Sequence, residues 1–209
     1  MNVLYILLGW FLGILSPGLV KRILDGYKKI ALRRTIVNEL KDIKNRLACI
    51  PMKVYPAYGA LDLRLFKWVQ EQTQNFTCFI SDNDDKKVLE ELCLKSDAEI
   101  VSLINTWNTR RKSENPSFHF KTMETSILDS NLINIEILDN DFLVRLLEIK
   151  FQIRTFNEEV KSVNEYLKMT FDSNITDENH QIIKQEIENK NHFISEKASY
   201  IVGVINNTI

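Results

Sequence analysis

Glycine and proline are both scarce in this chain, which contains 6 Gly and 4 Pro among its 209 residues. Gly203 is the only glycine after Gly59, so the sequence has no glycine-rich loop of the kind that binds nucleotide phosphates. The chain carries 27 Lys and Arg against 28 Asp and Glu. It therefore has no overall basic field that would favour nucleic acid, and direct nucleic-acid binding stays open.

Cysteine and histidine are also rare, with 3 of each. Cys49, Cys78 and Cys93 are isolated from one another and form no Cys-x-x-Cys pair, so we expect free thiols rather than a disulfide framework. The histidines lie far apart and none is paired with a cysteine, which argues against a zinc site. The sequence therefore predicts no metal site and no cofactor.

Charge is absent from residues 3–20, which form an apolar run. A helix of that length spans about 27 Å, close to the roughly 30 Å of a bilayer core. A cleaved signal peptide would carry its positive charges before the run, and a soluble core helix would show a polar face. We therefore predict a transmembrane anchor over residues 1–20 that contacts membrane lipid.

A basic cluster follows the run directly and contains only Asp25 as an acidic residue. Its members are Lys21, Arg22, Lys28, Lys29, Arg33 and Arg34. Because positive charge collects on the cytoplasmic side, we expect a single-pass membrane protein with its N-terminus outside and its domain in the cytoplasm.

Small residues within the run favour contact between copies. Gly9 and Gly13 form a Gly-x-x-x-Gly motif, whose spacing lets two helix backbones approach closely in lipid. Pro17 removes one backbone donor and is expected to kink the helix near the cytoplasmic interface. We therefore expect a homo-oligomer.

The remainder reads as helical. A basic neck helix is expected over residues 21–50, ended by Pro51, with a break near Arg33 and Arg34 where its apolar stripe shifts. Shorter helices are expected over residues 61–72, 85–94 and 97–112, the last entered through a Ser96–Glu99 capping box. Residues 118–121 are a candidate short strand.

Two long helices dominate the C-terminal half. Residues 141–170 carry a heptad stripe from Leu146 to Leu167, and Asp139 and Asn140 are the candidate N-cap residues of this helix. A second apolar stripe follows Thr176. A short turn between them predicts an antiparallel hairpin. We therefore predict an all-α fold in which an N-terminal transmembrane helix continues into a cytoplasmic helical bundle over residues 51–209.

Arg154 and Asn157 lie three residues apart on one face of the better helix, beside its apolar stripe. Such a pair could position a phosphate or a carboxylate, and the alternative is an exposed edge that keeps the helix soluble. Residues 110–119 also resemble the Arg-x(4–6)-His signature of HEPN ribonucleases, although the gap from Arg110 or Arg111 to His119 is too long and Pro116 interrupts it. An enzyme is therefore not expected.

This layout resembles the small membrane accessory proteins of type VI-B CRISPR systems, with Arg154 and Asn157 in place of the full HEPN motif. The resemblance implies a HEPN-like helical domain in a ring at a bacterial inner membrane. The membrane helices of the ring would form a pore that depolarises this membrane during phage infection, downstream of an RNA-guided nuclease. It also gives Arg154 and Asn157 a role in folding or assembly. The alternatives are a membrane-tethered HEPN-type ribonuclease and a passive scaffold that recruits a cytosolic partner.

Overall fold

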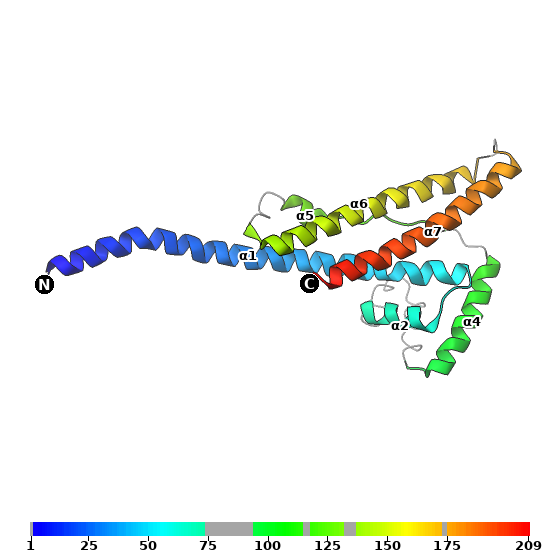
Figure 1. The fold of residues 1–209 in the computed structure, drawn as a ribbon, viewed down its shortest axis with the longest axis horizontal. Helices are drawn as coiled ribbons and strands as arrows, with labels where there is room; N and C mark the ends of the chain where they lie inside the picture. Colours follow the sequence, from blue (N-terminus) through cyan, green and yellow to red (C-terminus); the bar gives the residue numbers. More distant parts are fainter. Residues whose placement is uncertain (1, 74–93, 115–117, 132–136, 173–174) are drawn as a thin grey trace. The chain divides into compact units, whose positions relative to one another are not determined.

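The computed structural model describes residues 2–73, 94–114, 118–131, 137–172 and 175–209. Every regular element in those ranges is an α-helix, so the predicted all-α class is confirmed there (Figure 1). The helices are α1 (Asn2–Ala57), α2 (Leu63–Gln72), α4 (Asp97–Glu114), α5 (Ser126–Ser130), α6 (Asn140–Met169) and α7 (Asp177–Asn206). The strand predicted at residues 118–121 is wrong, because the structure assigns no regular secondary structure to this segment. The helix predicted at residues 85–94 lies outside the described residues, apart from its last position.

Two compact units divide the chain between them. The first consists of Met1–Glu39 and Thr125–Val144, and the second of Leu40–Glu124 and Arg145–Ile209. Helices α1 and α6 each contribute residues to both units.

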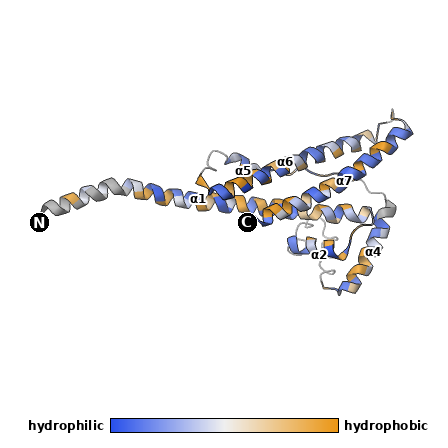
Figure 2. Cartoon of the chain, in the orientation of Figure 1, coloured by the Kyte–Doolittle hydropathy of each residue, from blue (hydrophilic) through white to orange (hydrophobic). Residues whose placement is uncertain are grey.

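The stripes predicted for the two C-terminal helices are confirmed as buried faces of α6 and α7, which Figure 2 colours as alternating apolar and polar patches. On α6 the stripe is almost fully buried from Leu146 to Val163, and Leu167 is half-buried. Helix α7 begins after its N-cap Thr176, whose hydroxyl accepts a hydrogen bond from the Asn179 amide. Its buried apolar residues are Ile183, Ile194, Ala198, Ile201, Val202 and Ile205.

Polar contacts between α6 and α7 fix their direction. Lys190 Nζ lies 2.8 Å from the Glu159 carboxylate, and further along the pair Lys197 donates to Gln152. Arg145, at the start of the second unit's part of α6, donates to the Asn207 carbonyl just after α7. Partners advance along α6 while they retreat along α7, so the predicted antiparallel hairpin is confirmed.

A smaller apolar cluster joins α2 and α4 to the end of α1. The predicted capping box is present, because Glu99 Oε2 accepts from the Ser96 amide at 2.9 Å and from its hydroxyl at 2.6 Å. Behind this cap, α4 buries Ile100 and Ile104, while Trp107 packs at the edge of the cluster. The cluster's buried members are Met52, Leu61, Phe66, Val69, Ile100 and Ile104.

Helix α1 does not stop at Pro51, and the predicted break near Arg33 and Arg34 is also wrong, because the helix runs unbroken to Ala57. Proline removes a backbone hydrogen bond, but residues on both sides of Pro51 are buried, and this packing outweighs the local preference. The true stop is Gly59, with φ of 69°. The Gly59 amide binds the Pro56 carbonyl and the Ala60 amide binds the Tyr55 carbonyl, which together make a Schellman cap.

Gly59→Ala is expected to destabilise the second unit by about 1 kcal/mol, because an alanine at positive φ is strained. The measurement is urea unfolding followed by tryptophan fluorescence. Gly203→Ala on α7 is the matched control, since an added Cβ there meets nothing within 4 Å and alanine favours a helix. Equal loss of stability in both variants would contradict the cap.

Cys49 is disulfide-bonded, so the expectation of free thiols is wrong for this residue. Its partner lies outside the described residues. Cysteine spacing does not reveal which segments fold against α1, and for that reason the sequence could not predict the pairing.

Candidate functional site

Arg154 lies on the solvent side of α6. Its side chain is 78% exposed, and its Nε lies 3.1 Å from Glu158 one turn later. An exposed i,i+4 pair of this kind contributes little stability and encloses no space for a ligand. The described structure therefore places Arg154 on an open helix edge.

Asn157 has a different environment, because its side-chain amide pairs with the backbone of the extended segment that precedes α5. Its Nδ2 donates to the Met123 carbonyl at 2.8 Å, and its Oδ1 accepts from the Met123 amide at 2.7 Å. Asn164, two turns along α6, donates to the Phe120 carbonyl at 3.0 Å. Asn157 and Asn164 therefore pair with the backbone of this segment, whereas Arg154 pairs with Glu158.

A polar cluster that the sequence did not single out lies between the end of α1 and α7. Asn191 Nδ2 donates to the Tyr58 hydroxyl at 3.1 Å, and the His192 ring lies 4.5 Å from the Tyr58 ring. Burial raises the pKa of Tyr58, and the Glu188 carboxylate adds to this effect, while the Asn191 donor opposes it. The Tyr58 phenol therefore stays in its neutral form at neutral pH.

The predicted membrane-helix contacts, Gly9, Gly13 and Pro17, all lie on α1 and are exposed. A Cβ added at Gly9 or at Gly13 would meet nothing within 4 Å. The described part of the chain therefore gives no reason of its own for either glycine. The backbone stays helical across Pro17.

Across the described residues, no helix combines the length and hydropathy expected of a membrane span. The backbone of residues 2–20 is helical, and the side chains described there, those of residues 7, 9, 10, 13 and 17–20, are exposed.

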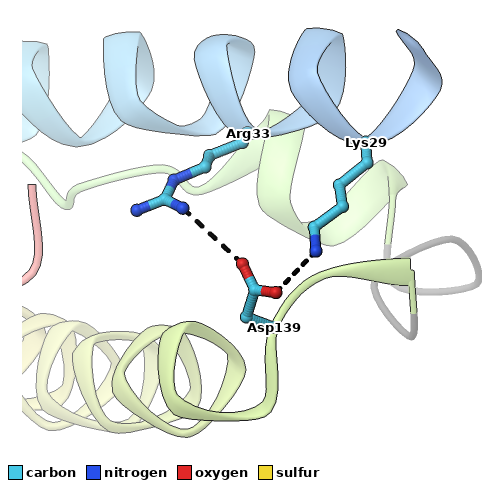
Figure 3. Close-up of polar contacts among 3 residues, drawn as sticks. All are labelled: Lys29, Arg33 and Asp139. Carbon is cyan, nitrogen blue, oxygen red and sulfur yellow. Dashed lines mark hydrogen bonds and ion pairs between the residues drawn. The ribbon is translucent and has the colours of Figure 1, made fainter. Parts of the chain in front are cut away.

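Two residues of the basic cluster on α1 form ion pairs with Asp139, which directly precedes α6. Lys29 Nζ lies 2.5 Å from Asp139 Oδ1, and Arg33 Nη1 lies 3.6 Å from Asp139 Oδ2 (Figure 3). The Arg33 guanidinium also lies 4.7 Å from the centre of the Phe142 ring. Asp139 was expected only as a helix cap, and its carbonyl does accept from the Leu143 amide at 2.9 Å. Lys21, Arg22, Lys28 and Arg34 are exposed.

The same unit holds α5 against α1 through Glu39. The Glu39 carboxylate accepts from the Ile127 amide at 2.8 Å and from the Leu128 amide at 2.9 Å. These are backbone donors of the first turn of α5, which otherwise have no helical partner. Thr125, the residue before α5, makes no capping hydrogen bond through its side chain, so the cap comes from α1.

The hydrogen bond and charge of Lys29, with the charge of Arg33, lower the pKa of Asp139. The stabilisation from this pair is therefore present at neutral pH and is lost as the pH falls through the lowered pKa. Lys29→Met is expected to raise the pKa of Asp139 toward its ordinary value of about 3.9, measured by NMR titration of its carboxyl carbon. Lys28→Met is the control and should leave it lowered; an equal rise in both variants would contradict the assignment.

The residues of the ribonuclease alternative lie on two segments of the second unit. Arg110 and Arg111 are exposed on α4, and His119 is exposed in the extended segment. A hollow of about 360 Å³ is lined by Gly59, Asn105, Asn108 and Thr109, without a titratable side chain among these lining residues. Within the described ranges, no three His, Cys, Asp or Glu side chains are placed to hold a metal ion.

Comparison with known proteins adds no family to these observations. The chain matches no protein-family model, no curated protein and no solved structure.

Proposed function

We propose that this chain is an oligomeric membrane protein anchored by the N-terminal part of α1. The observation that carries the proposal is the exposure of large apolar side chains there, with Leu7, Trp10, Leu19 and Val20 all more than half exposed. Their exposure in water is unfavourable, since each Å² of apolar surface removed from water contributes about 25 cal/mol. Lipid around an uncharged helix removes it without a protein partner.

The basic cluster supports the orientation in this proposal. Lys21, Arg22 and Lys28 are exposed directly after the uncharged run, where they retain the helical domain in the cytoplasm and meet anionic lipid headgroups. The N-terminus is then outside a bacterial inner membrane.

The activity in this proposal is formation of a pore by α1 helices from several copies. Its link to antiphage defence, downstream of an RNA-guided nuclease, rests on the resemblance in layout to the accessory proteins of type VI-B CRISPR systems. The exposed edge at Arg154 and the backbone pairing of Asn157 support a domain that assembles rather than one that catalyses a reaction.

Extraction and topology measurements test the membrane placement. The full-length protein is expected to stay with membranes at alkaline pH, and a cytoplasm-dependent reporter fused after Ile209 is expected to be active. Reversing the charge of Lys21, Arg22 and Lys28 together should reduce the correctly oriented fraction. Release at alkaline pH would contradict the anchor.

Cys49 provides an independent check on the orientation. Disulfides persist in oxidising compartments and are rare in the cytoplasm. The Cys49 disulfide in the structure therefore argues against a cytoplasmic domain, and the proposed orientation predicts that this bond is absent in intact cells. The oxidation state of Cys49 is measured by alkylation and peptide mass analysis after rapid acid quenching. A Cys49 disulfide in cells together with an inactive reporter would place the domain outside the cytoplasm and overturn the orientation.

A further inference from the structure

Helix α1 carries two apolar stripes on two different faces. The C-terminal stripe, Ile36, Leu40, Ile43 and Leu47, is at most 3% exposed. The N-terminal stripe is open, with exposed fractions of 54% for Val20, 57% for Ile23, 70% for Tyr27 and 68% for Ile30. Within each stripe the apolar residues are three or four positions apart. Ile36 follows Ile30 by six positions, which places it about a third of a turn around the helix from Ile30. The shift is a change of face on one continuous helix.

The chain itself occupies the polar side of this N-terminal stretch. Around the axis of α1, Lys29 and Arg33 each lie at least about 100° from the midpoint between Ile23 and Tyr27. Both bind Asp139 (Figure 3). The intrachain contact is therefore made by the charged face, while the apolar face of the same turns is left open to solvent.

The open stripe is continuous with the glycines of the predicted anchor. Gly13 precedes Val20 by two helical turns, and Gly9 precedes Gly13 by about one turn, so all three share a face. Glycine inside a helix is less favourable than alanine. Because the space around Gly9 and Gly13 is free, packing within the described chain does not require a glycine at either position. Close approach of a second helix does require small residues there.

Geometry decides between lipid and protein as the cover for this stripe, and this step rests on the membrane anchor proposed above. The headgroup layer adds only about 5–8 Å beyond each side of the hydrocarbon core. At 1.5 Å per residue, Tyr27 and Ile30 lie about 10 Å and 15 Å beyond Val20. Lipid does not reach that far along a helix leaving the membrane, but the α1 helix of a neighbouring copy, inserted in the same direction, does.

We propose that Val20, Ile23, Tyr27 and Ile30 continue the Gly9–Gly13 face as one seam, along which α1 of a second copy packs in parallel. The seam carries a heptad pattern, with apolar residues alternately three and four positions apart outside the anchor. The basic side chains bound to Asp139 lie away from it, so two copies associate without bringing Lys29 and Arg33 face to face.

Site-directed cross-linking of the full-length protein in lipid vesicles tests the seam. Ile23→Cys and Tyr27→Cys are expected to form disulfide-linked dimers far more readily than Asp25→Cys, which lies on the other side of α1. The chain without an added cysteine gives the background from its own thiols. Equal cross-linking at all three positions would overturn the seam.

A second variant guards against a trivial loss of structure. Tyr27→Lys is expected to weaken self-association at least about tenfold, measured by the mass of the solubilised protein, with helix content by circular dichroism unchanged. Asp25→Lys is the matched control and should retain the oligomer. Retention of the oligomer in Tyr27→Lys would overturn the proposal.

Two further outcomes separate the seam from the anchor. If the protein enters vesicles and a fluorophore on Tyr27→Cys is quenched by brominated lipid, lipid covers the stripe; the seam fails and the anchor stands. If the protein stays out of vesicles but Ile23→Cys and Tyr27→Cys still cross-link selectively, the anchor fails and the seam stands.

Discussion

Replacing Asn157 with alanine is expected to lower the free energy of unfolding of the helical domain by about 2–4 kcal/mol. The substitution leaves both the amide and the carbonyl of Met123 without their partner, at positions that are partly buried. Leaving one buried backbone group without its hydrogen-bond partner costs much more free energy than removing both partners of the bond together. Urea unfolding of the solubilised protein, followed by tryptophan fluorescence, measures the difference.

Arg154→Ala is the matched control, since it lies one turn away on the same helix. Its side chain is largely exposed, so its removal should change stability by no more than about 0.5 kcal/mol. Asn157→Asp should fall between the two, because it keeps the acceptor for the Met123 amide and loses the donor to the carbonyl. A destabilising Arg154→Ala with a neutral Asn157→Ala would show that the two residues have been assigned the wrong roles.

Exchange of residues 3–20 for an unrelated apolar helix of equal length is expected to abolish depolarisation while the protein stays in the membrane. A pore depends on which side chains line it and on how its helices pack, whereas a tether needs only length, hydropathy and orientation. The measurement is a potential-sensitive dye in cells that carry the RNA-guided nuclease and are challenged with phage.

The double substitution of Gly9→Leu and Gly13→Leu tests the pore by the same depolarisation measurement. It keeps the native helix and fills the face on which a second helix would approach, so depolarisation should again be lost. Gly26→Leu, also in open space, is the control for a bulky residue elsewhere on α1. Full activity after the exchange of residues 3–20 would instead support the passive scaffold.

The long helices could be predicted because their apolar residues repeat without interruption. The stripe from Leu146 to Val163 is buried as its spacing indicated, and the Ser96–Glu99 cap formed as its motif indicated. These features depend on residues close together in the sequence, where the helical period alone determines which side chains share a face.

Features that depend on distant residues were missed or misread. Pro51 looked like a stop because its local cost is visible in the sequence, whereas the burial of Met52 and Val54 is not. Asp139 looked like a cap, and its ion pairs with α1 come from residues more than a hundred positions away. The backbone partner of Asn157 was also missed, because nothing in the sequence shows that Met123 lies opposite it.

The order of synthesis has a consequence for the core that α7 completes. The buried residues of α7 continue to Ile205, and Asn191 reaches back to Tyr58 at the end of α1. A ribosome adding roughly 5–20 residues per second needs several to some thirty seconds to pass from the end of α1 to the end of α7. During that interval the apolar face of α1, and that of α6 once it has been synthesised, have no cover from α7. The nascent chain is therefore exposed to chaperones and to premature association with its neighbours.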